Sequence, residues 1–504
     1  MRLHHAERVR GSLRALALIV GLAVFAPHVV LAHGRLKSST PAAGAHLSAV
    51  PRELRLDFSE SPDLTFTLLR LVGPDGRAVS LGPLRFAADS RRSIVTALGG
   101  PMFAGIYTVT WQMAGDDGHP VRGKYVFVVA PGAAGIGVPP AAVDDRTRAG
   151  AKQSDASLMR DSMHHDPASM PEGNGFGSES PVYVVIRWLQ FIGLLLAIGA
   201  VSFRFFVLGT LRRAARDASS GVTHIISVAE RSAADLGRIA TGFLAITLLL
   251  RLGAQSYAMH GAADAFDMGL VAQMVQSTKW GWGWLVQLIG IVLAGAGYQR
   301  ARRTSVLETS DPKETSARIF WWRVAAMGAA LAAVAPALSG HAASAPRLRA
   351  LVIAADWVHV LSASSWLGTL AVLLAAGLTT ARQRGEGVSG QFVRSLVNAF
   401  SPVALVSAGL ASLTGVFAAW IHVGTIPSLW GTQYGITLLV KLGILGVVAM
   451  TGFYNWRYVQ PQLGTDAATA RLKRSAAVEV TVALLVLLVT AILVASPTSM
   501  DMVM

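Results

Sequence analysis

Cysteine is absent from the sequence. Its absence excludes disulfides, zinc ribbons and thiolate metal sites, so any site for a soft metal would have to use methionine sulfur or histidine nitrogen. Charged residues are also scarce: they make up 14% of the 504 residues, against about a quarter in an average soluble protein. A nucleotide-binding loop of the GxxxxGK(S/T) type is missing too, so the sequence does not support an ATP-driven pump.

Hydrophobic residues dominate instead. They form 52% of the chain, and the mean hydropathy is +0.48, which predicts a membrane protein in contact with a lipid bilayer. A net charge of +15 can indicate nucleic-acid binding. In a membrane protein, however, Lys and Arg gather in cytoplasmic loops, so we expect no nucleic acid among its partners.

Residues 1–32 have the pattern of a secretory signal peptide. A basic start precedes an apolar run from Ala15 to about Val30, which is short for a membrane span, and the pattern ends at Ala32. An uncleaved anchor is the alternative. Cleavage after Ala32 would make His33 the first residue of the mature chain. An N-terminal histidine can offer both its α-amine and its imidazole to Cu(II).

Residues 33–130 have the pattern of an exported β-domain. Apolar and polar residues alternate at 54–58, 65–68 and 107–111, and turn residues at 73–76 and 116–118 separate these runs. Several short strands at this spacing predict a small β-sandwich or barrel.

This domain resembles the CopC copper-resistance proteins. The matching segments, in order, are His33 with Ser38-Ser39-Thr40-Pro41-Ala42-Ala43-Gly44-Ala45, then Phe58-Ser59-Glu60, then Asp117-Gly118-His119-Pro120 with Gly123-Lys124-Tyr125-Val126-Phe127. The resemblance implies a cupredoxin-like or Ig-like β-sandwich in which the His33 amine and imidazole, Asp117 and His119 bind Cu(II). We expect one such site, because the Met-rich Cu(I) cluster of some CopC proteins is not visible. His46 is outside the motif and is interpreted as a surface residue.

Residues 131–180 have the composition of a flexible linker, first rich in Ala, Gly and Pro and then polar. Within the linker is a tract of methionines and histidines: Met159, Met163, His164, His165 and Met170. Thioethers suit Cu(I), so this tract is a candidate for copper capture. A chance of composition explains it equally well.

Residues 181–496 contain eight apolar stretches long enough to span a bilayer, and a short tail of residues 497–504 follows. The stretches are 183–209, 237–258, 281–299, 321–340, 351–378, 397–420, 435–454 and 475–496. Sixteen Lys and Arg residues follow the odd-numbered spans, whereas only Lys279, Arg347 and Arg349 lie in the opposite loops. The positive-inside rule therefore predicts that both mature termini, the β-domain and the tail lie in the periplasm, with the spans in the bacterial inner membrane.

On this topology four histidines fall toward the periplasmic side: His260, His341, His359 and His422. Ionisable side chains in a membrane are candidates for function. Asp356 is three residues before His359 on the same helix face, where a carboxylate can orient a metal-binding imidazole. We take these five residues as candidates for a copper path.

Two further ionisable residues, Lys441 and Glu479, lie inside apolar stretches. They either pair with each other or serve a proton or ion path. The sequence leaves both interpretations open.

The membrane half resembles the CopD copper-resistance membrane domain. The matching segments are Ser339-Gly340-His341-Ala342, Asp356-Trp357-Val358-His359, Trp366-Leu367-Gly368, Phe400-Ser401, Thr414-Gly415, Tyr434-Gly435, Lys441, Asn455, Arg474-Ser475 and Glu479. This resemblance implies that the domain moves copper across the inner membrane, for acquisition or resistance, with His341 and His359 as ligands. Other periplasmic copper carriers are candidate partners. No enzymatic activity is expected, and transport would be passive or ion-coupled.

Three alternatives remain open. The first is a membrane haem electron carrier of the b561 kind, with haem held between paired histidines on facing helices. In the second, the N-terminal copper site is oxidative, although an Asp ligand leaves less room for oxygen. The third is a copper sensor or buffer.

Overall fold

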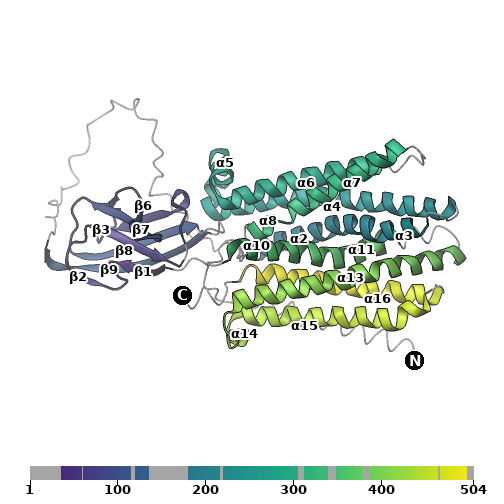
Figure 1. The fold of residues 1–504 in the computed structure, drawn as a ribbon. Helices are drawn as coiled ribbons and strands as arrows, with labels where there is room; N and C mark the ends of the chain where they lie inside the picture. Colours follow the sequence, from purple (N-terminus) through teal and green to yellow (C-terminus); the bar gives the residue numbers. More distant parts are fainter. Residues whose placement is uncertain are drawn as a thin grey trace.

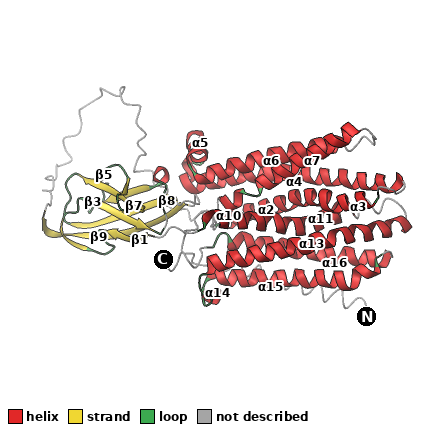
Figure 2. Cartoon of the chain, in the orientation of Figure 1, coloured by secondary structure: helices red, strands yellow, loops and turns green. Residues whose placement is uncertain are grey.

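The computed structural model describes residues 36–59, 61–114, 120–134, 180–215, 220–304, 312–338, 348–377, 386–463 and 466–496. They form a β-domain and a bundle of long helices, which lie end to end in Figure 1 and separate by secondary structure in Figure 2. The predicted fold class, a β-sandwich joined to a polytopic helical domain, is confirmed.

The β-domain consists of two sheets packed face to face. One has the strand order β1-β3-β7-β5, with β6 also paired to β7, and the other has the order β2-β9-β8-β4. The strands are β1 (Leu36–Thr40), β2 (His46–Ala49), β3 (Glu53–Phe58), β4 (Leu68–Val72), β5 (Ser80–Leu81), β6 (Arg85–Ala87), β7 (Ser90–Gly99), β8 (Gly105–Ala114) and β9 (Pro120–Ala134). The alternating runs at 54–58 and 107–111 are thus strands, as predicted.

Inward-facing apolar side chains from both sheets form the sandwich core. Phe58 of β3 contacts Trp111 of β8 edge to face, with ring centroids 5.1 Å apart. Trp111 pairs across the strands with Gly123, where a Cβ atom would lie 2.4 Å from the indole ring. The glycine of the Gly123–Phe127 segment is therefore needed so that the Trp111 ring can lie flat on β9.

Two details of the β-domain prediction are wrong. Residues Leu64–Phe66 form a 3₁₀ turn, η1, and β4 begins only at Leu68. Asp63 stabilises this turn, because its carboxylate accepts a hydrogen bond from the Thr65 amide at 3.0 Å. In addition, β9 continues to Ala134, into the segment predicted as linker, because its residues keep pairing with β2.

The eight predicted membrane spans are all present. They are built from α2 (Pro181–Ser202) with η3 (Phe203–Val207) and α3 (Leu208–Ala214), α4 (Ser220–Asp264), α6 (Lys279–Thr304), α7 (Pro312–Ala332) with α8 (Ala335–Leu338), α10 (Arg349–Ala363) with η4 (Ser364–Gly368), α11 (Thr369–Val372) and η5 (Leu373–Gly377), α13 (Glu386–Val423), α15 (Gln433–Tyr454) with η6 (Asn455–Val459) and η7 (Gln460–Gln462), and α16 (Asp466–Leu493). Two short helices were not predicted, α5 (Met268–Ser277) and α14 (Ser428–Gly431).

The helices have one end beside the sandwich and one end away from it, called here the sandwich end and the far end (Figure 1). α5 and α14 lie at the sandwich end, whereas α3 lies at the far end. Arg212 and Arg213 belong to α3, and Arg302 and Arg303 belong to the last turn of α6, which also reaches the far end. These arginines therefore lie on the opposite side of the bundle from the β-domain.

The first four spans pack closely on one another. A Cβ atom on Gly290 of α6 or on Gly328 of α7 would meet the backbone of the other helix at less than 3 Å. Small residues at such positions let membrane helices approach to backbone contact. Buried Glu230 of α4 is also paired with Arg204 of η3, with Arg212 of α3 and, at 3.9 Å, with Arg318 of α7.

Two of the last four spans are more open. In the span of α2, 67% of the apolar window is buried, against 11% and 17% in the spans of α13 and α15. α13 packs mainly on α10, and α15 packs mainly on α16. A cavity lies between α13 and the pair of α15 and α16.

Candidate functional site

Two polar side chains of the sandwich reach the end of α4. Gln112 of β8 is 3% exposed, and its amide donates a hydrogen bond to the Met259 carbonyl at 3.0 Å. Arg122 of β9 donates to the Ala258 carbonyl at 2.9 Å and to the Gln112 side-chain oxygen at 2.5 Å. Burial lowers the pKa of Arg122 from its ordinary value, which lies far above neutrality. A charged donor thus bridges the β-domain and the helical domain.

Apolar contacts surround this bridge. Phe66 of the η1 turn and Ala114 at the end of β8 belong to one buried cluster with Leu194, Met259 and Trp280 of the helical domain. The alternation at 65–68 that predicted a strand is therefore explained in part by burial of Phe66 against the helices. Because both sides are buried and hydrogen-bonded, the sandwich is seated on the bundle.

The contact lies at the end of the β8–β9 hairpin. Ala114 pairs with Pro120, and residues 115–119 connect them. The start of β1 belongs to the same end of the sandwich, because Leu36 pairs with Phe58 and Phe58 contacts Trp111. The predicted copper ligands His33, Asp117 and His119 themselves lie outside the described residues, as do His341 and the linker residues Met159, Met163, His164, His165 and Met170.

His359 of α10 is held by a neighbouring helix. Its Nδ1 lies 2.9 Å from the Ala411 carbonyl oxygen and 3.1 Å from the Thr414 hydroxyl, both on α13. A carbonyl can only accept, so Nδ1 carries the proton and Nε2 presents its lone pair. A Cβ atom on Gly415 would lie 3.3 Å from the imidazole, so this glycine makes room for the ring. A histidine fixed in this way through one nitrogen is suited to bind a metal with the other.

The orientation of His359 by Asp356 remains a prediction. Among the described contacts, His359 is held by α13 and donates no hydrogen bond to Asp356. Asp356 interacts electrostatically with Lys441 of α15 instead, and Lys441 also acts on His359. Among the described contacts, the Glu479 carboxylate is bonded to Asn455, whereas the charge that acts on Lys441 is that of Asp356.

The other two described histidines of the candidate copper path lie at the sandwich end. The His260 ring is 6.2 Å from Phe66 at the domain contact, and its Nδ1 lies 3.1 Å from the Ser256 hydroxyl. The His422 ring is 6.3 Å from Tyr434, at the start of α15. Within the described ranges, no three His, Asp or Glu side chains converge as a metal site would require. His260, His359 and His422 are therefore separate positions.

The cavity between α13 and α15 contains the second ionisable residue noted in the sequence. Its volume is about 870 Å³, and Glu479 of α16 lines it together with Ser401, Asn455 and Gln460. The Asn455 amide donates to the Glu479 carboxylate, and the Ser475 hydroxyl donates to the Asn455 oxygen. Sequence reasoning noticed Glu479 but not this partner. The one available signal was an Asn and a Glu in otherwise apolar stretches.

Three family models match the chain in sequence. The CopC domain matches residues 36–130, the "Copper resistance protein D-like, N-terminal domain" matches residues 178–349, and "Copper resistance protein D" matches residues 394–493. The matched ranges follow the boundaries of the sandwich and of the helical domain. They assign the first four spans and the last three spans to different models.

Individual relatives agree. The chain is 23% identical to "Copper transport protein CutJ" of Bacillus subtilis (strain 168) over 94% of this chain and 76% of that protein. It is 34% identical to "Copper resistance protein C" of Escherichia coli over 22% of this chain and 90% of that protein. The solved structure of CopC from Methylosinus trichosporium OB3b is 27% identical over 20% of this chain and 95% of that chain, with a TM-score of 0.19. The chain belongs to the copper resistance proteins that join a CopC domain to a CopD membrane domain.

Proposed function

We propose that the chain binds copper on its β-domain outside the membrane and passes it to the helical domain, which moves it across the inner membrane for copper acquisition or resistance. The observation that carries this proposal is the seating of the β8–β9 end on the bundle through Gln112 and Arg122. A carrier domain held in this way can deliver its cargo without dissociating, which raises the effective concentration at the next site. The protein would be a transporter and not an enzyme.

The capture site would bind Cu(II) through His33, Asp117 and His119. One amine, two imidazoles and a carboxylate form the tetragonal nitrogen and oxygen set that Cu(II) favours. Two observations support this set. Asp117 and His119 belong to the connection between Ala114 and Pro120, and β1, which begins three residues after His33, starts at the same end of the sandwich. The described strand ends next to both groups of ligands lie at the end of the sandwich that faces the helices.

The membrane path would begin among the histidines at the sandwich end. His359 is the strongest candidate, because its Nδ1 is anchored and its Nε2 is oriented as a lone-pair donor. His341, His260, His422 and Asp356 are the other candidates, and Cu(I) is a further cargo that the linker methionines or the membrane domain would accept. The arginine-rich far end would face the cytoplasm, as the positive-inside rule requires.

The capture site is tested by copper titration of the purified mature protein, followed by electron paramagnetic resonance and by N-terminal sequencing. We expect one Cu(II) with nitrogen ligation per chain, and its loss in His33→Ala and His119→Ala. His46→Ala is the matched control, because His46 is exposed on β2 outside the motif. A mature chain that begins elsewhere than His33, or full binding by H119A, contradicts the site.

The membrane path is tested separately with His359→Ala and His341→Ala. Both variants should keep the Cu(II) signal of the β-domain, yet cells that express them should accumulate less copper in the cytoplasm than cells with the native protein. Cytoplasmic copper equal to that of the native strain would refute a path through these histidines. A haem absorption band in the purified protein would instead favour the b561-like alternative.

A further inference from the structure

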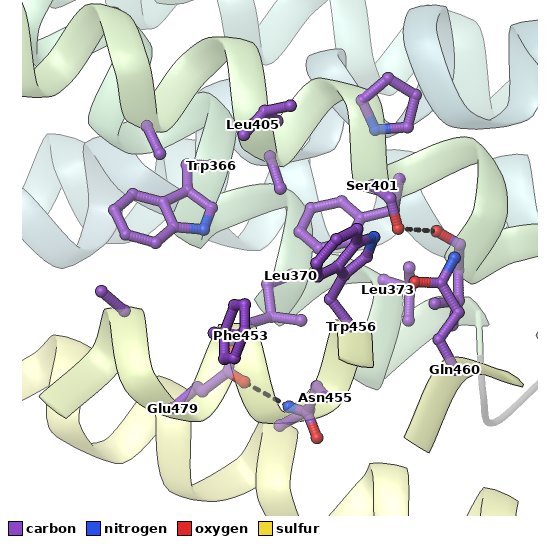
Figure 3. Close-up of a pocket in the computed structure, with 18 of the residues that line it drawn as sticks. Trp366, Leu370, Leu373, Ser401, Leu405, Phe453, Asn455, Trp456, Gln460 and Glu479 are labelled. Carbon is purple, nitrogen blue, oxygen red and sulfur yellow. Dashed lines mark hydrogen bonds between the residues drawn. The ribbon is translucent and has the colours of Figure 1, made fainter. Parts of the chain in front are cut away.

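The cavity between α13 and α15 is apolar over most of its wall and polar at one end. Figure 3 shows Trp366, Leu370 and Leu405 on one side, and Ser401 and Gln460 on the other. Ser401 precedes Leu405 along α13, which runs from the far end toward the sandwich, and Gln460 follows α15 at its far end. Most of the polar lining therefore lies toward the far end of the bundle, with Ser412 on the sandwich side of Leu405 as the exception.

Glu479 is the only ionisable side chain among the described residues that line this cavity. It is 6% exposed, and its described hydrogen bond comes from Asn455, a neutral amide. A buried carboxylate is costly as an anion unless a cation or several donors compensate it. Glu230 in the same bundle is compensated by three arginines. Glu479 has an uncharged partner and an adjoining cavity instead.

The charged groups on the elements packed against Glu479 do not supply the missing cation. The described ones are Lys441 on α15, Arg457 on η6, Arg187 on α2, Arg394 and His422 on α13, and Arg471, Lys473 and Arg474 on α16. Arg187 is hydrogen-bonded to the Ala491 carbonyl, and Lys441 interacts with Asp356. Within the described part of the chain, none of these groups lies within 4.0 Å of the Glu479 carboxylate.

We propose that Glu479 takes up a proton from this cavity and releases it again, and that this exchange accompanies the passage of copper through the bundle. The second half of this proposal rests on the transport function proposed above. The lining favours a proton over copper, because it offers carboxylate, amide and hydroxyl groups and, among the described lining residues, no methionine or histidine. An O–H bond forms on a Glu479 oxygen when the proton arrives from water, and the same bond breaks when it leaves.

The arrangement is suited to such an exchange. Asn455 and Ser475 hold the carboxylate in place through neutral hydrogen bonds, which leave the charge on Glu479 free to change. Asn455 begins the π-helical segment η6, and two further π-helical segments, η4 and η5, contribute Trp366 and Leu373 to the same wall. Such segments recur at functional sites, because they open the regular helix ladder.

Proton binding is measured directly by infrared difference spectroscopy of the full-length protein in liposomes during a pH titration. A carboxylic-acid band that titrates in the native protein should be missing in Glu479→Gln, which keeps an acceptor for Asn455, and should return shifted in Glu479→Asp. Leu405→Ala, which changes the apolar wall of the same cavity without touching a polar or ionisable group, should keep the band. An identical titration in native protein and E479Q would overturn the proposal.

Coupling is measured in the same liposomes with a pH-sensitive dye inside and copper added outside. Native protein, L405A and E479D should move protons when copper moves, whereas E479Q should lose this signal. If E479Q instead loses bound copper from the membrane domain, the cation at this site is copper and the proposal is wrong. If native protein moves no copper at all, the transport function fails, and the infrared titration alone decides whether Glu479 takes up a proton.

Discussion

Two buried glutamates of the same bundle, Glu230 and Glu479, have partners of different charge. Glu230 is completely buried in the tightly packed first half, and Arg204, Arg212 and Arg318 surround it. Glu479 is almost as buried in the second half, yet its partner is a neutral amide and it borders a cavity. In a low-dielectric interior, a carboxylate surrounded by arginines has a fixed charge, whereas one beside an amide has a charge that can change.

The helices around Glu230 also pack more closely than α13 and α15, which lie near Glu479. Glycines bring α6 and α7 into backbone contact, and the sandwich is seated on α4 of this half through Ala258 and Met259. In the second half, α13 and α15 leave most of their surface exposed, and π-helical segments line the space between them. We interpret the first half mainly as a rigid support for the copper-binding domain, and the second as the half that contributes His359 and Glu479.

The largest effect should follow from Glu230→Gln. The substitution leaves the positive charges of Arg204, Arg212 and Arg318 without a counter-charge in a buried place, and breaking a buried ion pair costs about 3–5 kcal/mol. We expect a much lower melting temperature for the detergent-purified protein by scanning fluorimetry. Glu479→Gln is the matched control and should melt near the native temperature. Equal losses for the two variants would remove the distinction between a structural and a titrating glutamate.

The sequence alone predicted the eight spans, because an apolar run of sufficient length is recognisable without knowing what it packs against. It also predicted the strands at 54–58 and 107–111, where alternation reflects burial on one face of a sheet. Helix ends were less well placed. The second span was predicted to begin at residue 237, but α4 begins at Ser220, because its polar first turns carry no hydropathy signal.

The partners of the ionisable residues could not be predicted. Lipid-facing and protein-facing sides of a membrane helix are both apolar, so hydropathy does not tell which helix lies beside which. Lys441 therefore seemed as suited to Glu479 as to Asp356, and the carbonyl of Ala411 that orients His359 gives no sequence signal. The contact between the sandwich and the bundle could not be predicted either, because polar residues such as Gln112 and Arg122 are ordinary in an alternating strand.

A smaller loss of stability should follow from removing the hydrogen bonds that hold the sandwich to α4. In a double variant, Gln112→Ala and Arg122→Ala, the carbonyls of Ala258 and Met259 lose their donors, and each unsatisfied buried group costs about 1–3 kcal/mol. Because the chain has no cysteine, spin labels on two introduced cysteines, one in each domain, report the distance between the domains without background. We expect this distance distribution to broaden and copper transport to slow, while Cu(II) binding by the sandwich persists.

Arg85→Ala is the control for the double variant, since Arg85 is exposed on β6 in the other sheet. It should leave the distance distribution unchanged. A sharp, native-like distribution in the double variant would mean that the apolar cluster around Phe66 and Trp280 is sufficient to hold the domain.

The smallest loss of stability is expected from an ion cluster on the surface of the sandwich. Like the cluster of Glu230 it joins arginine and carboxylate groups, but it is exposed to water. On the sandwich surface, Arg55 donates to Asp57 at 2.9 Å and to both carboxylate oxygens of Asp89. Desolvation raises the pKa of Asp57, but hydrogen bonds from Ser93, Ser38 and Arg55 outweigh it and hold the pKa below its ordinary value. Such partly exposed pairs contribute at most about 1 kcal/mol.

A carboxyl whose pKa is lower in the folded state stabilises the fold above its ordinary pKa, near 4, and loses that contribution as the pH falls through the lower folded value. Asp57→Asn should therefore destabilise the sandwich slightly at pH 7, and the difference from the native protein should vanish in acid. A cysteine introduced at buried Val109 would be the chain's sole thiol, so its rate of labelling by a pyridyl disulfide reports opening of the sandwich in the full-length protein. Comparing D57N with the native residue in this background cancels the pH dependence of the reagent. If the difference in labelling rate between D57N and the native residue instead grows toward acid, desolvation of Asp57 outweighs its hydrogen bonds. Asp57 would then resemble Glu479 more than Glu230.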